Sequence, residues 1–157
     1  MSWQVRMPIM RAFRERFGEP GMNDTNWQRP GSGFSDLLGY RFKKRDTDYC
    51  EMELTVEHKH LNRLNVPHGG ALATLIDTAA GAAVGFAQGP DKLLPAVTLS
   101  LAIQFLGQAK VGDVLTATGR RIGGGRTIAY GTAEIINQDG RAIARGDGTF
   151  RYVTPRS

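Results

Sequence analysis

The sequence predicts an α+β fold in which one antiparallel sheet curls around a single long helix. Residues 69–86 are an almost unbroken run of Ala, Leu, Ile, Val and Gly, long enough for several helical turns. The segments on either side of this run alternate apolar and polar residues, which is the period of strands that bury one face. Short turns separate most of them, so consecutive strands are expected to pair antiparallel.

The first part of the chain is expected to form an extension of the domain. Residues 1–18 are rich in Arg and weakly amphipathic, which predicts a short helix, and they lack the long apolar stretch of a signal peptide. Residues 18–34 are dense in Gly, Pro and Asn, as loops are. We therefore expect an N-terminal helix and loop extension over residues 1–34 and one folded domain over residues 35–157.

Two strands are predicted before the long helix. Residues 37–45 and 49–57 flank the sequence Asp-Thr-Asp, and the second segment alternates apolar residues with acids and threonine. The helix that follows is apolar on nearly all sides, which is unusual for a helix packed on one sheet. The sheet is therefore expected to curl around the helix, and a second chain could bury whatever stays exposed.

Four more strands are predicted after the helix, at residues 96–106, 112–122, 125–137 and 140–153. The first carries apolar residues at every second position: Val97, Leu99, Leu101, Ile103 and Phe105. These side chains are expected to share one face. A glycine run between the second and third strands, and Gln-Asp-Gly between the third and fourth, are typical of hairpin turns.

Charge and composition restrict the classes of partner. The net charge of +5 favours anionic partners, but the basic residues are scattered and no run resembles a nucleic-acid-binding tail. The single Cys50 cannot form an internal disulfide. A membrane span over residues 69–86 is disfavoured because its central Asp would cost about 2.5–3.5 kcal/mol on insertion. We therefore expect a cytoplasmic protein with no nucleic-acid and no membrane partner.

The residues before the helix have the composition of a site for a developing negative charge. Pro67 cannot continue strand pairing, and His68, Gly69 and Gly70 follow it directly. The first N–H groups of a helix have no internal partner and lie at the positive end of the helix dipole. Glycines leave these groups unshielded, as in an oxyanion hole. A structural interpretation stays open, in which His68 caps the helix and the glycines permit tight packing.

Asp77 lies within the apolar helix, and no basic residue is near it in sequence. A buried carboxylate without a partner is costly, so it is normally hydrogen-bonded, protonated or functional. Thr74 or Thr78 could donate to it. Asp77 follows His68 by nine residues, which in a helix is a half-turn and an advance of about 13 Å. It can therefore reach a helix start only on a neighbouring chain related by a two-fold axis.

These same residues resemble those of a known family. Asn62, then His-Gly-Gly at residues 68–70, then Asp77 on the helix are similar to the pattern of the PaaI-like branch of the hotdog-fold acyl-CoA thioesterases. The segments "AVTLSLAIQFL", "GRTIAYGTAEIIN" and "GRAIARGDGTFRY" are also similar, so the resemblance covers residues 37–152. The combination of Asn, His-Gly-Gly and a helical Asp is fairly specific, whereas His-Gly-Gly by itself is not.

The resemblance implies a hotdog fold, in which an antiparallel sheet wraps around one long central helix. It implies that the chain hydrolyses an acyl- or aryl-acyl-coenzyme A thioester to a free acid and coenzyme A. Two protomers would share a continuous sheet as a homodimer, and the family often forms homotetramers. Coenzyme A enters as part of the substrate, and no metal or other cofactor is expected.

The resemblance also implies roles for individual residues. Asp77 would be the nucleophile or the base that activates water, and the Gly69 N–H of the other protomer would polarise the thioester carbonyl. Asn62 and His68 would orient the carbonyl and the thiolate, and Thr98 would help to position water. The remaining expected substrate-binding residues are Gly70, Arg120, Arg121, Arg126 and Thr127.

Other functions stay open from the sequence. A hotdog dehydratase or hydratase would use an Asp–His pair on one segment, and an acyl-CoA-binding regulator would bind without turnover. His58 and His60 could hold zinc, although Glu-His-Lys-His is more typical of a solvated strand end. A serine triad and a nucleotide P-loop are poorly supported, because the Gly-x-Ser-x-Gly and Gly-Lys-Ser/Thr patterns are missing from the sequence.

Overall fold

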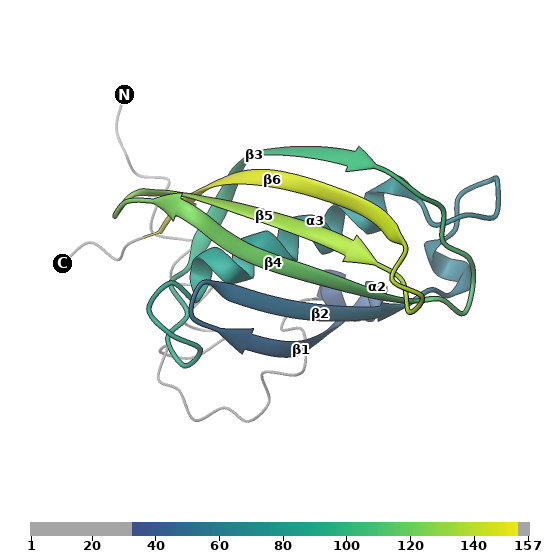
Figure 1. The fold of residues 1–157 in the computed structure, drawn as a ribbon, viewed down its shortest axis with the longest axis horizontal. Coiled ribbons are helices and arrows are strands. Elements are labelled where there is room, and N and C mark those ends of the chain that lie inside the picture. Colours follow the sequence, from purple (N-terminus) through teal and green to yellow (C-terminus); the bar gives the residue numbers. More distant parts are fainter. Residues whose placement is uncertain (1–32, 154–157) are drawn as a thin grey trace.

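The structure is a computed structural model that describes residues 33–153. The helix expected at residues 1–18 and most of the loop expected after it lie outside the described residues. The elements follow one another along the chain as shown in Figure 1: α2 (Gly33–Leu38), β1 (Arg41–Asp46), β2 (Tyr49–Thr55), the 3-10 turn η3 (His58–His60), α3 (Gly69–Gly85), β3 (Ala96–Phe105), β4 (Val114–Gly124), β5 (Ile128–Ile136) and β6 (Ala142–Tyr152).

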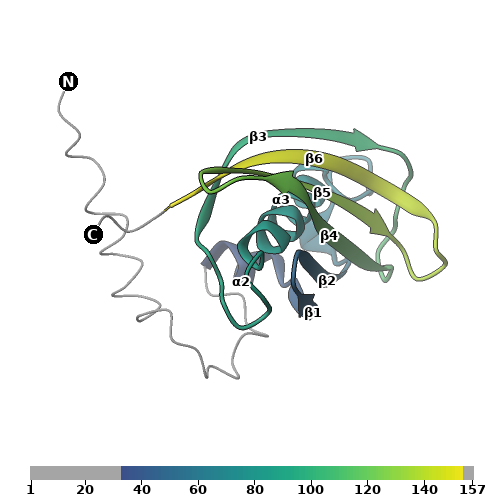
Figure 2. The ribbon, with the colours of Figure 1, turned by 60° about the vertical axis from the view of Figure 1, so that its left-hand side comes forward.

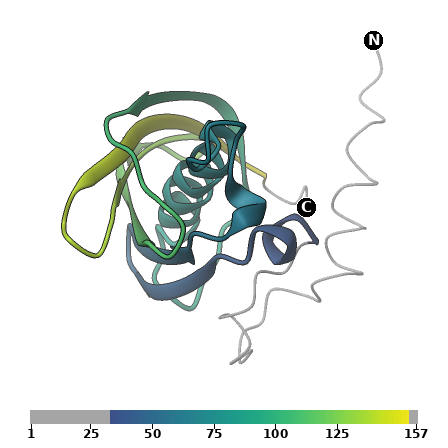
Figure 3. The same cartoon turned by 90° about the vertical axis from the view of Figure 1, so that its right-hand side faces the viewer.

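The six strands form one antiparallel sheet in the order β1-β2-β4-β5-β6-β3. Figures 2 and 3 show the sheet curling around α3, which confirms the fold predicted from the apolar helix. One pairing differs from the expectation that consecutive strands are neighbours: β3 pairs with β6, and β4 lies between β2 and β5. The connection over residues 106–113 is not a tight hairpin, so it can carry the chain from one edge of the sheet to its middle.

Small residues let α3 lie close against the sheet. Leu75, Ile76 and Ala79 are fully buried on the helix. Gly119 of β4 lies directly beneath the helix, where a Cβ atom would overlap the Ala79 carbonyl. Burying a side chain as large as Leu or Ile contributes about 1.5–3 kcal/mol, and these contacts make up the core. None of the helices in residues 33–153 has the length and hydropathy of a membrane-spanning segment.

The helix α2 occupies part of the segment that was expected to be loop and strand. Leu37 and Leu38 lie in this helix, so their prediction as strand is wrong. Asp36 in its first turn favours the helix. Gly39 ends the helix with a φ of +80°, and its N–H donates a hydrogen bond of 2.8 Å to the Ser35 carbonyl. The expected boundary between residues 34 and 35 therefore falls inside α2.

A β-bulge interrupts the alternation of β3. The register against β6 shifts between Thr98 and Ser100, so side chains before and after this point alternate out of phase. Leu101 and Ile103 pack against the core as expected. The prediction of one shared face is wrong for Val97 and Leu99, which are exposed. Phe105 stays in phase with Leu101 and Ile103, although its side chain is exposed.

The two edge strands of the described sheet differ in charge. The edge strand β1 carries four basic residues: Arg41, Lys43, Lys44 and Arg45. The edge strand β3 carries no charged residue, and apolar side chains are exposed along it and just after it: Val97, Leu99, Phe105 and Leu106. Charges on an edge oppose pairing with another strand, whereas a long uncharged edge is open to it.

Candidate active site

His68 opens the helix α3 as its N-cap residue. Its Nδ1 accepts a hydrogen bond of 2.8 Å from the Gly70 N–H, and its carbonyl accepts one of 2.9 Å from the Ala71 N–H. The structural interpretation of His-Gly-Gly is therefore correct for His68. The Gly70 N–H is already used, whereas the Gly69 N–H makes no hydrogen bond within residues 33–153. Gly69 thus presents the first free amide of the helix.

Asn62 closes the loop that leads to this helix. Its Oδ1 accepts hydrogen bonds from the N–H groups of Leu64 at 2.8 Å and Val66 at 3.4 Å, and its own N–H donates to the Val66 carbonyl. A backbone bridge between Leu61 and Pro67 closes the loop at its base. The side-chain oxygen Oδ1 of Asn62 is therefore engaged within the loop. Its side-chain nitrogen Nδ2 is the group that could donate to a ligand.

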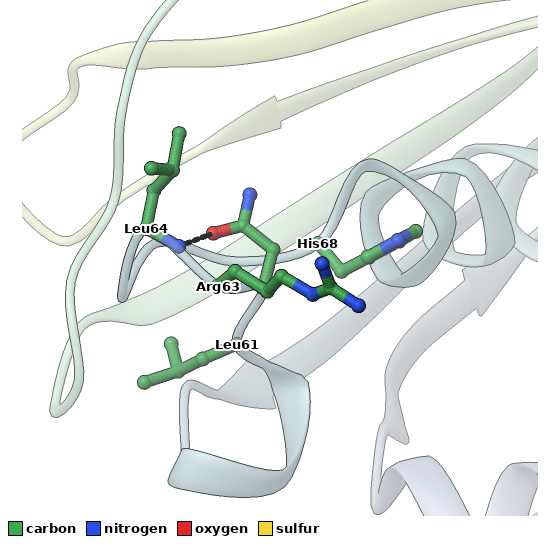
Figure 4. Close-up of a pocket in the computed structure, with 5 residues that line it drawn as sticks. Leu61, Arg63, Leu64 and His68 are labelled. Atoms are coloured by element: carbon green, nitrogen blue, oxygen red, sulfur yellow. Dashed lines mark hydrogen bonds between the residues drawn. The ribbon is translucent and has the colours of Figure 1, made fainter.

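An open hollow of about 630 Å³ lies beside this loop. Arg63 and His68 line it together with Leu61, Asn62 and Leu64, and Figure 4 draws these five residues as sticks. Arg63 brings a cation into this hollow and was not among the site residues expected from the sequence. Its position next to Asn62 was the signal that could have identified it.

Asp77 and Thr98 meet between the central helix and the edge strand. The Thr98 hydroxyl donates a hydrogen bond of 2.7 Å to Asp77 Oδ1, and Asp77 is half-buried. The alternative that Thr74 or Thr78 partners Asp77 is not observed, since the Thr74 hydroxyl donates to the Gly70 carbonyl at 2.9 Å. Two of the expected site residues are thus in direct contact.

One chain does not bring all the expected catalytic residues together. Gly69 and Asp77 lie eight residues apart on the continuous helix α3, which separates them by about 12 Å along its axis. His68 and the free Gly69 amide therefore form one group at the start of the helix. Asp77 and Thr98 form a second group near its middle.

The expected coenzyme-binding residues are spread over the end of the sheet formed by β4 and β5. The Arg120 guanidinium lies 4.8 Å from the centre of the Tyr49 ring. Arg121 forms an ion pair of 3.5 Å with Asp48. Both arginines therefore have partners within the chain. Two further residues lie exposed at the turn between the strands: Arg126 and Thr127.

The remaining candidates for chemistry have structural surroundings. His60 is buried in η3, so the interpretation of this segment as a solvated strand end is wrong for His60, whereas Glu57, His58 and Lys59 are exposed. In the described part of the chain no group of three or more His, Cys, Asp and Glu residues is placed to hold a metal ion. Burial raises the pKa of the Cys50 thiol to about 12, so this group is not a thiolate at neutral pH.

The chain is similar to known thioesterases. The model of the thioesterase superfamily matches residues 64–144. The acyl-coenzyme A thioesterase PaaI of Escherichia coli is 34% identical over 128 residues, which cover 78% of this chain and 88% of that protein. Acyl-coenzyme A thioesterase 13 of Mus musculus is 32% identical over 101 residues, 64% of this chain and 69% of that protein.

Solved structures give the same result. The structure of the E. coli PaaI protein superposes with a TM-score of 0.72 at 30% identity, covering 78% of this chain and 86% of that chain. A thioesterase protein of Streptococcus pneumoniae, solved with coenzyme A, has a TM-score of 0.66 at 31% identity, covering 75% of this chain and 91% of that one.

Proposed function

The chain belongs to the thioesterase superfamily and is an acyl-coenzyme A thioesterase, and from this premise we propose that two copies of it build each active site. The observation that supports this most directly is the division of the expected residues along α3. The free Gly69 amide and the Asp77–Thr98 pair belong to one rigid helix, and no side-chain rotation can close about 12 Å between them. A second helix running the opposite way supplies each group with its complement.

The uncharged edge of the sheet is the proposed contact between the two copies. If β3 pairs with the β3 strand of a second copy around a two-fold axis, the sheet continues across both chains. The exposed Val97 and Leu99 would then be covered. The same contact would bring the start of one α3 toward the middle of the other. We propose that a homodimer holds two such sites. A homotetramer would contain two of these homodimers.

In the proposed reaction the thioester carbonyl accepts a hydrogen bond from the Gly69 N–H of one copy. Asp77 of the other copy takes a proton from water, and the resulting hydroxide adds to the carbonyl carbon. The negative oxygen of the tetrahedral intermediate is held at the positive end of the helix. The C–S bond then breaks, the acid is released, and the thiolate of coenzyme A takes up the proton. No metal or further cofactor enters this scheme.

Other residues of the site have supporting roles in this proposal. Thr98 engages Asp77 Oδ1, which leaves Oδ2 as the oxygen that faces the water. The Asn62 amide and His68 orient the thioester from the loop beside α3. The exposed Arg126 would bind a phosphate of the coenzyme A moiety, with Thr127 beside it, since charge-assisted hydrogen bonds to phosphate are strong. We place the reaction in the cytoplasm.

Release of free thiol from a panel of aryl- and fatty acyl-coenzyme A thioesters tests this function. We expect Asp77→Asn to lower kcat by about 10²–10⁴-fold, the usual contribution of a general base, while calorimetry shows retained binding. The control is Asp91→Asn, at an exposed carboxylate away from the site. A wild-type protein that binds these thioesters without turnover would instead be an acyl-CoA-binding regulator. Full activity in Asp77→Asn would overturn the assigned role.

Direct attack by Asp77 is the alternative to its action as a base. Both routes need the Asp77 carboxylate in the same position. They differ in which product group can contain the oxygen atom that came from water. A single turnover in H₂¹⁸O labels the Asp77 carboxylate only if that carboxylate attacked the thioester. Label found solely in the released acid supports the base mechanism.

A further inference from the structure

His60 is a buried polar side chain that joins two segments far apart in sequence. It is 2% exposed. Its Nδ1 accepts a hydrogen bond of 2.8 Å from the Glu57 N–H, and its Nε2 lies 2.7 Å from the Leu38 carbonyl oxygen. Burying a polar group costs free energy unless its hydrogen bonds are made, and here both ring nitrogens have partners.

The hydrogen-bond partners of the His60 ring identify its tautomer. A backbone N–H can only donate, so Nδ1 carries no proton where it meets Glu57. A carbonyl oxygen can only accept, so the ring proton is on Nε2 and points at Leu38. The ring therefore links the end of α2 to Glu57, the N-cap residue of η3, in one defined orientation.

The backbone of His60 continues this link to the proposed catalytic helix. Its carbonyl accepts a hydrogen bond of 2.7 Å from the N–H of His68, the N-cap residue of α3. His68 in turn accepts from the Gly70 N–H. His60 thus holds both ends of the loop from residue 60 to residue 68. Asn62 lies near the start of this loop, and the free Gly69 amide follows directly after it.

We propose that His60 is a positioning residue for thioester hydrolysis, which fixes the start of α3 so that the Gly69 N–H is aimed at the substrate carbonyl. This inference rests on the proposed function. His60 touches no substrate and acts through His68. A misplacement of about 1 Å at a reacting group can cost about 10²-fold in rate. Loss of this anchor is therefore expected to lower kcat in the molecules that remain folded.

Two substitutions separate the hydrogen bonds of the ring. His60→Asn places an oxygen near the position of Nδ1 and keeps an acceptor for Glu57, while it loses the donor to Leu38. His60→Gln can keep an N–H near the position of Nε2 and so the bond to Leu38. We expect each to lower kcat by about 10- to 100-fold with little change in KM, when activity is referred to the folded fraction measured by circular dichroism.

The control is His58→Gln, because His58 is exposed in the same turn η3. We expect this variant to match the wild type. Unchanged kcat per folded molecule in both His60 variants would overturn the positioning role and leave His60 as a structural residue only. A proportional rise in KM with unchanged kcat would overturn it as well, since the anchor would then serve substrate binding.

An NMR measurement makes the test independent of catalysis. The backbone amide signals of Gly69 and Gly70 report the geometry of the helix start directly. We expect both signals to shift in His60→Gln and to stay in place in His58→Gln. Unshifted signals in His60→Gln would refute the inference. A wild-type protein without thioesterase activity would refute the proposed function, while the shifts would still decide whether His60 positions Gly69.

Discussion

Thr98 on the edge strand donates a hydrogen bond of 2.7 Å to Asp77 on the central helix. The contact occurs next to the β-bulge of β3, where the register shifts between Thr98 and Ser100. Bulges re-aim side chains and are common beside active sites. This bulge lets Thr98 face the helix while Leu101 and Ile103 still pack in the core.

The Thr98 hydroxyl should matter for rate more than its bulk. We expect Thr98→Val to lower kcat by about 10- to 100-fold, because a hydrogen bond to a charged group is worth about 1.5–3 kcal/mol and each 1.36 kcal/mol is a factor of ten. Thr98→Ser keeps the hydroxyl and should keep most of the activity. Steady-state kinetics on one thioester compares the two. Equal loss in both would mean that the methyl group, not the hydrogen bond, is required.

The shared active site can be tested by mixing inactive subunits. Gly69→Pro removes the proposed amide donor at the first helical position, where proline is well tolerated, and His68 already has an extended conformation suited to precede it. Asp77→Asn removes the carboxylate. We expect each variant to be inactive alone, and co-expressed mixtures to regain about a quarter of wild-type activity, because each mixed dimer contains one intact site.

The matched control for this experiment is Gly69→Ala, which keeps the N–H while adding a side chain. An added Cβ would meet the Phe105 ring at 3.2 Å, a contact the proline variant shares. Activity in Gly69→Ala together with inactivity in Gly69→Pro isolates the amide. Mixtures that stay inactive would show that both groups act within one chain.

The uncharged edge of β3 should determine the oligomeric state. Leu99 is 54% exposed on this edge, and Leu99→Lys places a charge where a second strand would pair. We expect the variant to sediment as a monomer and to lose activity. Val111→Lys adds the same charge at an exposed apolar residue outside β3 and should remain like the wild type. A wild type that is monomeric and fully active would contradict the proposed contact.

The close approach of helix and sheet should tolerate no added atom at Gly119. An added Cβ would overlap the Ala79 carbonyl of α3, and both groups are backbone-anchored. We expect Gly119→Ala to lower the free energy of unfolding by about 1–3 kcal/mol or more, as overpacking does. Gly125→Ala is the control, since nothing lies within 4 Å of an added Cβ there. Urea denaturation that gives equal midpoints would show that the helix can move away freely.

Stability at acid pH should depend on Asp113, which is 4% exposed. The hydrogen bond from the Gln138 side chain, followed by that from the Lys110 N–H, lowers the pKa of this carboxyl below 3.8. Since the folded pKa is below the unfolded one, the stabilisation is full above pH 3.8 and is lost as the pH falls through the folded pKa.

We expect Asp113→Asn to be about 1.5–3 kcal/mol less stable than the wild type at pH 7. The difference should narrow as the pH falls below 3.8, as measured by urea denaturation from pH 7 to pH 2.5. Asp139→Asn, at an exposed carboxylate of the neighbouring turn, should show a smaller difference. A gap for Asp113→Asn that stays constant down to pH 2.5 would mean that the folded and unfolded pKa values are equal.

The sequence was sufficient for features that depend on local pattern. The apolar run located α3 to within one residue of its observed end, because no polar residue interrupts its buried faces. The resemblance named Thr98, but the alternation of Val97 and Leu99 as buried residues would have turned Thr98 away from Asp77. A bulge adds one residue to a strand without a mark in its composition, so period counting could not find it.

Long-range contacts were also beyond the sequence. His60 looked like part of a solvated polar segment because its neighbours His58 and Lys59 are polar. The Nε2 atom of the buried ring lies against the carbonyl oxygen of Leu38, which is 22 positions earlier in the chain. The helix α2 is only six residues long, too short for helical periodicity to outweigh the strand pattern beside it.

The contrast between the two edges of the sheet would also limit how far the proposed assembly can extend. If two β3 strands pair, neither uncharged edge remains open. Each outer edge of the resulting twelve-stranded sheet would then be a β1 strand, which carries four basic residues. Two β1 edges carry like charges and would repel each other, so a third chain would not pair with the dimer through this edge. In the proposed dimer the charged β1 edges would therefore oppose the addition of further chains along the sheet, and neutralising Lys43 and Lys44 would weaken this opposition.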